Sequence, residues 1–377
     1  MSATTHPRPG TRTARVALAA LCTAGLALTA AACTNSGTAS GGSSSTGAAA
    51  AAGANAQQTA AATGAAGPAC TYQSYGGSGV PKLTIGAGTK IGFSQSESTT
   101  NPFRATETAS IVAEAKKVGV TLLQANANAD VNAQNSQIES LIAQGAQALI
   151  VAPENSDGLA PALAEAKAKK IPVLTIDRTA GTACQNVISF IGSDFTGQAE
   201  AAADDLAKAT GQKAKIAILT GTPGNNVAVD RTNGFRNELK KYPGMSVVAQ
   251  QTGQFAETTG QQVMAQLLQA HPDITAVYAE NDEMALGAIQ AVKAAGKTPG
   301  KDVKIVSIDG IQQCVEDVSS GVMAADIETN PRFGPLAFQS LKNFYSSTGV
   351  PANVIIKDQH FDDSGLAKQA LASGNVY

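Results

Sequence analysis

The chain contains no tryptophan, and aromatic residues make up only 4% of its 377 residues. Charged residues account for 15%, both signs are interspersed, and the formal net charge is −2. Nucleic-acid binding requires a basic patch, often with aromatic residues interleaved, so we expect no nucleic-acid partner. Histidines number three, and neither His271 nor His360 has other ligand-type residues clustered near it. We therefore expect no metal site.

The motifs of several common enzyme classes are also missing. The sequence has no GxSxG, GxGxxG or GxxxxGK[ST], and no histidine is arranged with a nucleophile. A pair of carboxylates could still support glycoside hydrolysis. The aspartates identified below stand beside hydrogen-bond donors, however, which is typical of acceptors rather than of an acid with a raised pKa. We therefore expect a non-enzymatic protein without a cofactor.

Long apolar runs are lacking except near the N-terminus, where residues 16–32 are rich in Ala and Leu, follow three arginines and end at Cys33. This pattern predicts a signal peptide over residues 1–33. No other stretch approaches the ~20 apolar residues of a membrane span. The sequence Leu-Thr-Ala-Ala-Ala-Cys at residues 28–33 resembles a bacterial lipoprotein box, which implies lipid attachment at Cys33 on the outer face of the cell membrane. Secretion without a lipid is the alternative.

Residues 34–68 consist almost only of small and polar side chains. Such a segment has nothing to bury, so we expect a disordered tether over residues 34–81 and a folded part over 82–377. The folded part is long enough for two lobes. Three cysteines remain beyond Cys33, namely Cys70, Cys184 and Cys314. Their odd number is compatible with one disulfide and one leftover thiol, and the pairing stays open.

Short β-branched runs alternate with helical patterns along the folded part. Repeated strand–helix units predict parallel sheets with right-handed crossovers. About eleven strands are too many for one sheet, so we expect an α/β fold of two doubly wound parallel-sheet lobes. The expected strands are 83–93, 120–124, 148–152, 172–176, 187–191, 215–219, 247–252, 274–279, 303–308, 324–329 and 354–361.

Polar residues follow several of these strands. Ligands of open α/β sheets bind beyond the carboxyl ends of the strands, so these residues are candidates for a site. Helix N-caps also favour Asp and Asn, which is the structural alternative at each position. The strand-end pairs are Asp177-Arg178, Ser193-Asp194, Asn281-Asp282 and Asp309-Gly310.

Several segments together resemble the type I periplasmic sugar-binding proteins, in particular the ribose- and galactofuranose-binding members. The resemblance covers nearly all of residues 82–377. The Phe-Ser-Gln and Arg-Ala-Thr-Glu-Thr pieces are similar to the galactofuranose type. The segments that carry the resemblance are Ile91-Gly-Phe-Ser-Gln95, Phe103-Arg-Ala-Thr-Glu-Thr108, Ile176-Asp-Arg178, Val229-Asp-Arg-Thr-Asn-Gly-Phe235, Ala279-Glu-Asn-Asp-Glu-Met284, Ser307-Ile-Asp-Gly310 and residues 287–296.

The resemblance implies two lobes that close on a ligand like a hinged jaw. Three crossings are implied near Asp194, Thr329 and Val350. Lobe one would then comprise residues 82–194 and 329–352, and lobe two residues 195–328 and 353–377.

The resemblance also implies which residues contact the sugar. Arginine forks would donate to ring and hydroxyl oxygens, carboxylates would accept from hydroxyls, and aromatic rings would cover the apolar sugar face. The structural alternatives are ion pairs for the arginines, a core position for Phe255 and an N-cap role for Asn281. The expected ligand-binding residues are Ser94, Gln95, Phe103, Arg104, Asp177, Arg178, Arg231, Phe255, Asn281 and Asp309.

By resemblance the chain is the monomeric solute-binding subunit of an ABC importer, with membrane permease subunits as partners. The sugar would be galactofuranose-like or another pentose or hexose. Ala152 is apolar where ribose-type members carry a polar contact, which counts against ribose itself. A sugar sensor that presents its ligand to a membrane receptor is the alternative. A sugar-sensing repressor is disfavoured, because a signal peptide and tether stand where its helix-turn-helix would be.

Overall fold

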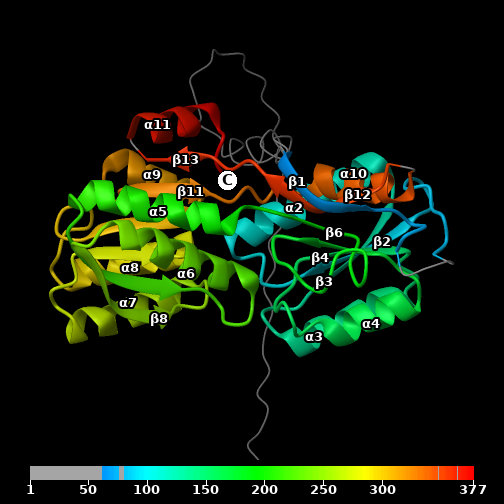
Figure 1. Cartoon of the computed structure of the whole chain (residues 1–377), viewed down its shortest axis with the longest axis horizontal. Coiled ribbons are helices and arrows are strands. Elements are labelled where there is room, and N and C mark those ends of the chain that lie inside the picture. The colour runs from blue at the N-terminus through cyan, green and yellow to red at the C-terminus, as the bar shows by residue number, and fades with distance from the viewer. Residues whose placement is uncertain (1–61, 76–79, 347, 363) are drawn as a thin grey trace, which may run out of the picture. The chain divides into compact units, whose positions relative to one another are not determined.

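The computed structural model describes residues 62–75, 80–346, 348–362 and 364–377 (Figure 1). The expected signal peptide, Cys33 and the tether up to residue 61 lie outside the described residues. Among the helices of the described part, none has the length and apolar character that a membrane crossing needs.

The first sheet has seven strands in the order β1-β12-β6-β5-β4-β2-β3. All neighbours are parallel except β1, which runs antiparallel to β12 at one edge. Side chains alternate between two cores: Ile150 packs on the face covered by α2 and α10, whereas Leu149 packs on the face covered by α3 and α4. The strands are β1 (Ala62–Cys70), β2 (Lys90–Gln95), β3 (Thr121–Asn126), β4 (Ala148–Val151), β5 (Val173–Ile176), β6 (Ser189–Gly192) and β12 (Val350–Ile356).

The second sheet has six strands in the order β13-β11-β10-β9-β7-β8, again parallel except for the short edge strand β13. Helices cover both of its faces, so the expected α/β fold with two parallel-sheet lobes is confirmed. The strands are β7 (Ala214–Thr220), β8 (Met245–Thr252), β9 (Ala276–Ala279), β10 (Lys304–Asp309), β11 (Ala325–Glu328) and β13 (His360–Phe361).

Helices connect the strands in both halves. We call the first sheet with α2, α3, α4 and α10 lobe one, and the second sheet with α5 to α9 and α11 lobe two. The helices are α2 (Pro102–Val118), α3 (Val131–Ala143), α4 (Ala160–Ala168), α5 (Phe195–Thr210), α6 (Asn226–Glu238) with the 3₁₀ turn η1 (Leu239–Lys241), α7 (Glu257–Ala270), α8 (Asp282–Ala294), α9 (Gln312–Ser320), α10 (Gly334–Tyr345) and α11 (Ser364–Ser373).

The chain passes between the two sheets three times: at residues 193–194, at 329–333 and at 357–359. The third crossing lies after β12 and not near Val350. Asn353, Val354 and Ile355 pair with β6, which keeps them in the first sheet. For the same reason the expected strand 354–361 is two strands in two sheets.

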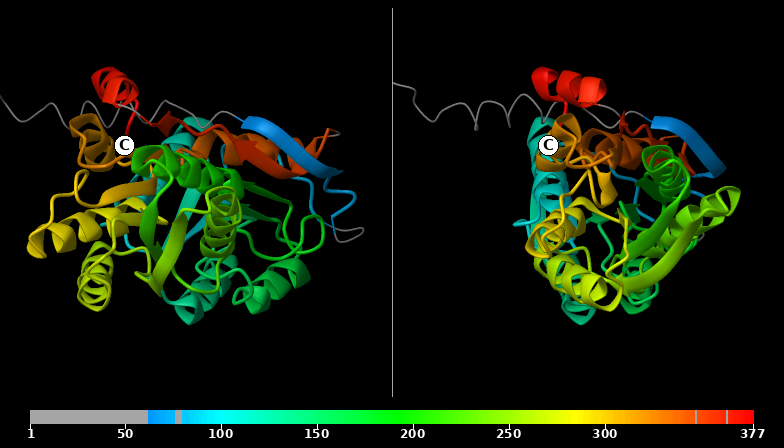
Figure 2. Two further views of the ribbon diagram at one scale, coloured as in Figure 1. Left: turned by 60° about the vertical axis from the view of Figure 1, so that its left-hand side comes forward. Right: turned by 90° about the vertical axis from the view of Figure 1, so that its left-hand side faces the viewer.

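The expected tether is too long at its C-terminal end. Residues Ala62–Cys70 form β1, which lies along β12 at the edge of lobe one (Figure 2). A disulfide joins Cys70 to Cys184, and the free Cys314 is buried. The Tyr75 hydroxyl donates to the Asn186 carbonyl at 2.8 Å. The expected strand 83–93 also begins later, at Lys90.

The disulfide yields a first prediction. Cys70 and Cys184 are 114 residues apart, so the bond closes a long loop in the unfolded chain. Cys70→Ser should lower the free energy of unfolding by about 2–5 kcal/mol, as measured by urea denaturation. A reductant should destabilise the wild type similarly and leave Cys70→Ser unchanged; equal stability of both proteins without reductant would contradict the pairing.

Candidate functional site

The carboxyl ends of both sheets face one small cavity. Each lobe contributes about half of the lining. The lining residues are Glu97, Asn101, Phe103, Arg104, Asp177 and Arg178 from lobe one, and Val227, Arg231, Phe255, Asn281 and Asp309 from lobe two.

The first turn of α2 places three of these residues. The Asn101 side chain caps the helix by accepting a hydrogen bond from the Arg104 backbone amide at 3.1 Å. Pro102 occupies the first turn, where a missing N–H costs nothing. The local sequence Asn-Pro therefore determines where α2 begins, and Phe103 and Arg104 lie in its first turn.

Arg104 is the centre of an ion-pair cluster in lobe one. Its Nε lies 2.9 Å from Glu97 Oε2, and its Nη1 lies 2.9 Å from Glu107 Oε2 and 2.8 Å from Asp177 Oδ2. Only 3% of Arg104 is exposed. A buried guanidinium needs such partners, because desolvation of an unpaired charge costs several kcal/mol.

Arg178 extends the same cluster. Its Nη2 lies 2.8 Å from Glu97 Oε1, and its Nη1 lies 3.3 Å from Glu154 Oε2. The Arg178 amide donates to the Ile176 carbonyl at 2.6 Å and closes a tight turn around Asp177, whose φ is 62°. A non-glycine residue in this region costs about 1–3 kcal/mol, and such strain is concentrated at functional sites.

Arg231 has the corresponding role in lobe two. Its Nη2 lies 2.9 Å from Asp309 Oδ1 and 2.7 Å from Thr329 Oγ1, and its Nη1 donates to the Glu280 carbonyl. Asp309 ends β10 with a φ of 145°. Among the described residues, neither Arg231 Nε nor Arg178 Nε has a hydrogen-bond partner within the protein.

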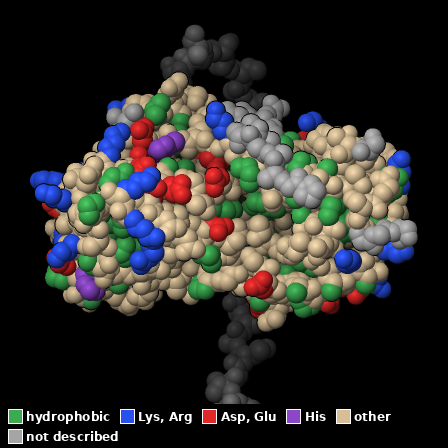
Figure 3. Space-filling model, in the orientation of Figure 1, with side chains coloured by type: hydrophobic (Ala, Val, Ile, Leu, Met, Phe, Trp, Pro, Cys, Tyr) green, Lys and Arg blue, Asp and Glu red, His purple; other side chains and the backbone are tan. Residues whose placement is uncertain are grey.

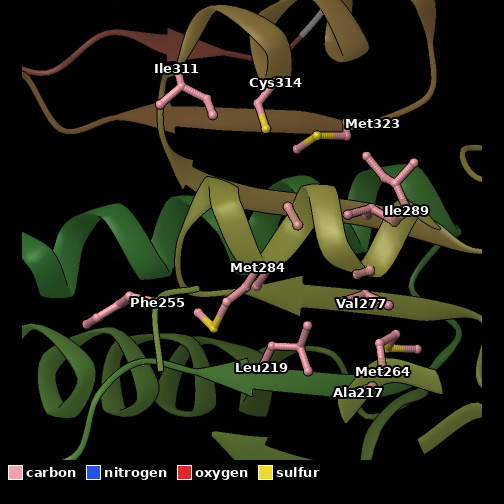
Figure 4. Close-up of a cluster of buried hydrophobic side chains, with 14 of the residues drawn as sticks. Ala217, Leu219, Phe255, Met264, Val277, Met284, Ile289, Ile311, Cys314 and Met323 are labelled. Carbon is pink, nitrogen blue, oxygen red and sulfur yellow. The ribbon is translucent and has the colours of Figure 1, made fainter. Parts of the chain in front are cut away.

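Apolar side chains form the remainder of the wall. Phe255 has a φ of 55° and lies at the margin of the lobe-two core beyond Met284 (Figure 4). Its ring packs on Gly221, where a Cβ atom would lie 1.9 Å from Phe255 Cζ. The Arg178 guanidinium lies 5.5 Å from the centre of the same ring. Phe255 thus belongs to the core and to the cavity.

Asn281 also combines two roles. It is the N-cap of α8, where its side chain accepts a hydrogen bond from the Met284 amide at 3.1 Å. The residue lines the cavity as well. The N-cap interpretation and the cavity interpretation of this residue are therefore compatible.

Burial raises the pKa of the carboxyl groups, whereas nearby arginines lower it. Burial raises the pKa of Glu97, but the charges of Arg178 and Arg104 outweigh it and hold the pKa at about 2. For Glu107, Glu154 and Asp309, burial prevails over the neighbouring arginine and raises each pKa to about 7. Two arginines thus do not keep all the carboxyl groups of the lobe-one cluster charged at neutral pH. The expectation that the strand-end aspartates lack a raised pKa is wrong for Asp309, because its burial outweighs the charge of Arg231.

Ser94 and Gln95 do not line the cavity. Ser94 is fully buried in β2, where its hydroxyl accepts from Gln134 Nε2 at 3.2 Å. Gln95 donates to Glu107 Oε2 at 2.8 Å and supports the carboxylate behind Arg104. Both were expected to close the first strand toward the ligand, but the strand continues through Gln95 and the first cavity residue after it is Glu97.

Three lining residues were not predicted from the sequence: Glu97, Asn101 and Val227. Glu97 follows the end of β2, so the rule that polar residues gather after parallel strands could have found it. Asn101 precedes a proline at a helix start, which is a recognisable capping signal. Val227 carries no signal, because an apolar residue in the first turn of a helix usually belongs to the core.

On the face shown in Figure 3, Lys and Arg side chains as well as Asp and Glu side chains are visible on the described surface. Within the described residues, no group of three or more His, Cys, Asp or Glu side chains is placed to hold a metal ion.

Comparison with known proteins gives consistent matches. A family model described as a periplasmic binding protein domain matches residues 91–344. The galactofuranose-binding protein YtfQ of Escherichia coli K12 is 32% identical over 77% of this chain and 92% of its own. A ribose import binding protein of Bacillus subtilis is 37% identical over 64% of this chain and 76% of its own.

Solved structures agree with these matches. A Mycobacterium smegmatis protein in complex with β-D-fucofuranose superimposes with a TM-score of 0.73. It is 35% identical, and the alignment covers 76% of this chain and 95% of the other.

The buried carboxyl groups predict a pH dependence of stability. Glu280 accepts hydrogen bonds from the Gly221 amide and the Thr232 hydroxyl, and burial raises its pKa to about 7. Because the unfolded chain releases this proton near pH 4.5 and the folded chain near pH 7, folding stability should fall as pH rises through that window. Glu280→Gln mimics the protonated form.

We expect Glu280→Gln to reduce the decline of folding stability with pH by at most about 1.4 kcal/mol per pH unit. Urea unfolding at pH 5, 6, 7 and 8 measures the effect. The exposed Glu139→Gln serves as the control. If the free energy of unfolding of wild type and of Glu280→Gln changed in parallel with pH, Glu280 would already be ionised in the folded protein over this pH range.

Proposed function

The chain belongs to the type I periplasmic sugar-binding protein family, of the ribose and galactofuranose type, and on this premise we propose that it binds one small sugar in the cavity between its lobes. The observation that carries the proposal is the convergence of arginine forks, carboxylates and two phenylalanine rings from both lobes on one small space. A sugar has hydroxyl groups that donate and accept hydrogen bonds, and it has an apolar ring face. The arginines and carboxylates of the cavity match the hydroxyls, and the phenylalanine rings match the apolar face.

The charge balance supports an uncharged ligand. Each lining arginine already lies 2.8 or 2.9 Å from a carboxylate oxygen of its own lobe. An anionic ligand would have to displace one of those carboxylates. A neutral polyol can instead accept from the remaining N–H groups and donate to the carboxylate oxygens. The relatives are named for galactofuranose and ribose, and one solved relative holds fucofuranose, which supports a pentose or hexose.

The proposed residue roles follow from this geometry. Arg104, Arg178 and Arg231 donate to sugar oxygens, whereas Asp177 and Asp309 accept from hydroxyls, one from each lobe. Phe103 and Phe255 cover the ring faces, and Asn281 contributes an amide. We propose that the lobes open and close about the three crossings, so that bound sugar favours the closed arrangement. None of these roles requires a covalent step.

We further propose that the chain delivers its sugar to the permease of an ABC importer as a lipid-anchored monomer. The relatives are named as binding proteins, several of them as import binding proteins, which supports transport over catalysis. The lipoprotein-like segment before Cys33 supports an anchor outside the cell. Loss of sugar uptake on deletion would separate transport from the alternative sensing role.

A thermal-shift screen tests the ligand proposal. A sugar at ~100 times its dissociation constant should stabilise the fold by about 2.7 kcal/mol, which is a shift of a few degrees in the melting temperature.

Arg231→Lys keeps the charge but removes the planar fork, so it should weaken sugar binding about tenfold or more. Arg236→Lys, on the exposed side of the same helix, should bind like the wild type. A panel of pentoses and hexoses that produces no shift would refute the proposed ligand class.

Fractionation of cells tests the anchor. Wild-type protein should sediment with membranes, and Cys33→Ala should lose this association because no lipid can be attached. Immunoblotting of the two fractions measures the distribution. If wild type and Cys33→Ala distribute alike, the protein is secreted without a lipid.

A further inference from the structure

The two lobes also contact each other directly outside the cavity. The contacts join the loop after β4 and the residue after Arg178 in lobe one to the loop between β7 and α6 and to the first residue of α6 in lobe two. We call the four residues that form them the clasp: Ser156, Thr179, Gly224 and Asn226. None of them belongs to a crossing between the sheets.

Three hydrogen bonds make up the clasp. The Thr179 amide donates to Asn226 Oδ1 at 2.8 Å, the Asn226 amide donates to Ser156 Oγ at 3.1 Å, and the Ser156 amide donates to the Gly224 carbonyl at 3.0 Å. Hydrogen bonds of this kind weaken steeply once the atoms separate beyond about 3.5 Å. A rotation of one lobe against the other therefore breaks them.

The approach of the two loops also depends on a glycine. Gly224 has a φ of 92°, and a Cβ atom there would lie 2.0 Å from Asn155 Nδ2 of lobe one. A side chain at this position would therefore have to adopt a backbone conformation that L residues rarely adopt, and the Asn155 side chain would have to move. The clasp thus combines three hydrogen bonds between the lobes with the close approach of Gly224 to the Asn155 side chain.

The clasp is separate from the cavity but adjacent to it in the chain. None of its four residues lines the cavity, whereas Arg178 and Val227, which directly precede and follow clasp residues, do. The ion pairs of the three cavity arginines stay within single lobes. Across the cavity, the Arg178 guanidinium lies over the Phe255 ring, and the Phe103 ring of lobe one lies 6.2 Å from the Tyr377 ring of lobe two. The clasp therefore favours closure without touching the ligand.

We propose that the clasp sets the equilibrium between open and closed lobes and thereby scales the affinity for every sugar by the same factor. The proposal rests on the proposed sugar-binding function. When only the closed state is competent to bind tightly, the apparent dissociation constant is the intrinsic one divided by the closed fraction. A contact that is present only in the closed state and remote from the ligand changes that fraction and leaves discrimination between sugars unchanged.

Asn226→Ala is the direct test, because it removes the acceptor of the Thr179 amide. Calorimetry on the purified full chain would use D-galactose and D-fucose, which differ by one hydroxyl. Both dissociation constants should rise by the same factor, about three- to tenfold for one neutral hydrogen bond. The dissociation rate should rise correspondingly.

Asn225→Ala is the matched control. Asn225 caps the same helix by accepting from the Ala228 amide at 3.1 Å, and it makes no contact with lobe one among the bonds described. It should lower the melting temperature and leave both dissociation constants unchanged. Ser156→Ala, from the other lobe, removes a different clasp bond and should reproduce the Asn226→Ala effect if that variant fails to fold.

A ligand-free measurement keeps this test independent of the sugar. Spin labels at Lys167→Cys in α4 and Lys240→Cys in η1, both exposed positions on different lobes, report the distance between lobes by pulsed electron paramagnetic resonance. Gly224→Ala and Asn226→Ala should each shift the distribution to longer distances. Longer distances in these variants would support the role of the clasp even if neither sugar bound to the wild type. Absence of binding by the wild type would count against the proposed ligand and not against the clasp.

Two results would overturn the proposal. Unequal changes in the two dissociation constants would mean that Asn226 acts on the sugar itself. Unchanged affinities together with an unchanged distance distribution would mean that the clasp bonds contribute nothing to closure.

Discussion

Burial of three guanidinium groups is the constraint on which the architecture of the site depends. Arg104, Arg178 and Arg231 are each at most 3% exposed, and an unpaired charge at such a depth costs several kcal/mol. Carboxylates must therefore stand within hydrogen-bond distance, and the ends of parallel strands and the starts of helices supply them. Buried ion pairs add little net stability, so their value lies in the fixed orientation of the donors.

The same burial holds the cavity side chains of each lobe in fixed orientations. Asp177, Phe255 and Asp309 all have positive φ angles, and each is a cavity residue. Strain of this kind persists only where surrounding structure imposes it. Here the ion pairs and the close packing of Phe255 on Gly221 do so. A preorganised site loses less entropy when it binds, which favours affinity at a given contact area.

Local rules predicted most of the fold and much of the cavity lining. Strand–helix alternation predicted two parallel sheets, and polar residues after β5, β9 and β10 pointed to Asp177, Asn281 and Asp309. The rules failed where partners are distant in sequence. β1 has a composition typical of a tether, yet it pairs with β12 far along the chain. Ser94 and Gln95 were misplaced because the period of a strand does not reveal where it ends.

By itself, the sequence determined the α/β class and the two parallel sheets, because periodicity and strand-end chemistry act over a few residues. The family and the expected sugar-site residues followed from the resemblance of its motifs to known proteins. Only the tertiary structure decided which carboxylate pairs with which arginine, that Cys70 joins Cys184, and that Asn226 reaches Thr179 in the other lobe. Most of these contacts join residues that are tens of positions apart, up to 114 for the disulfide, and their geometry is set by packing, which no local pattern encodes.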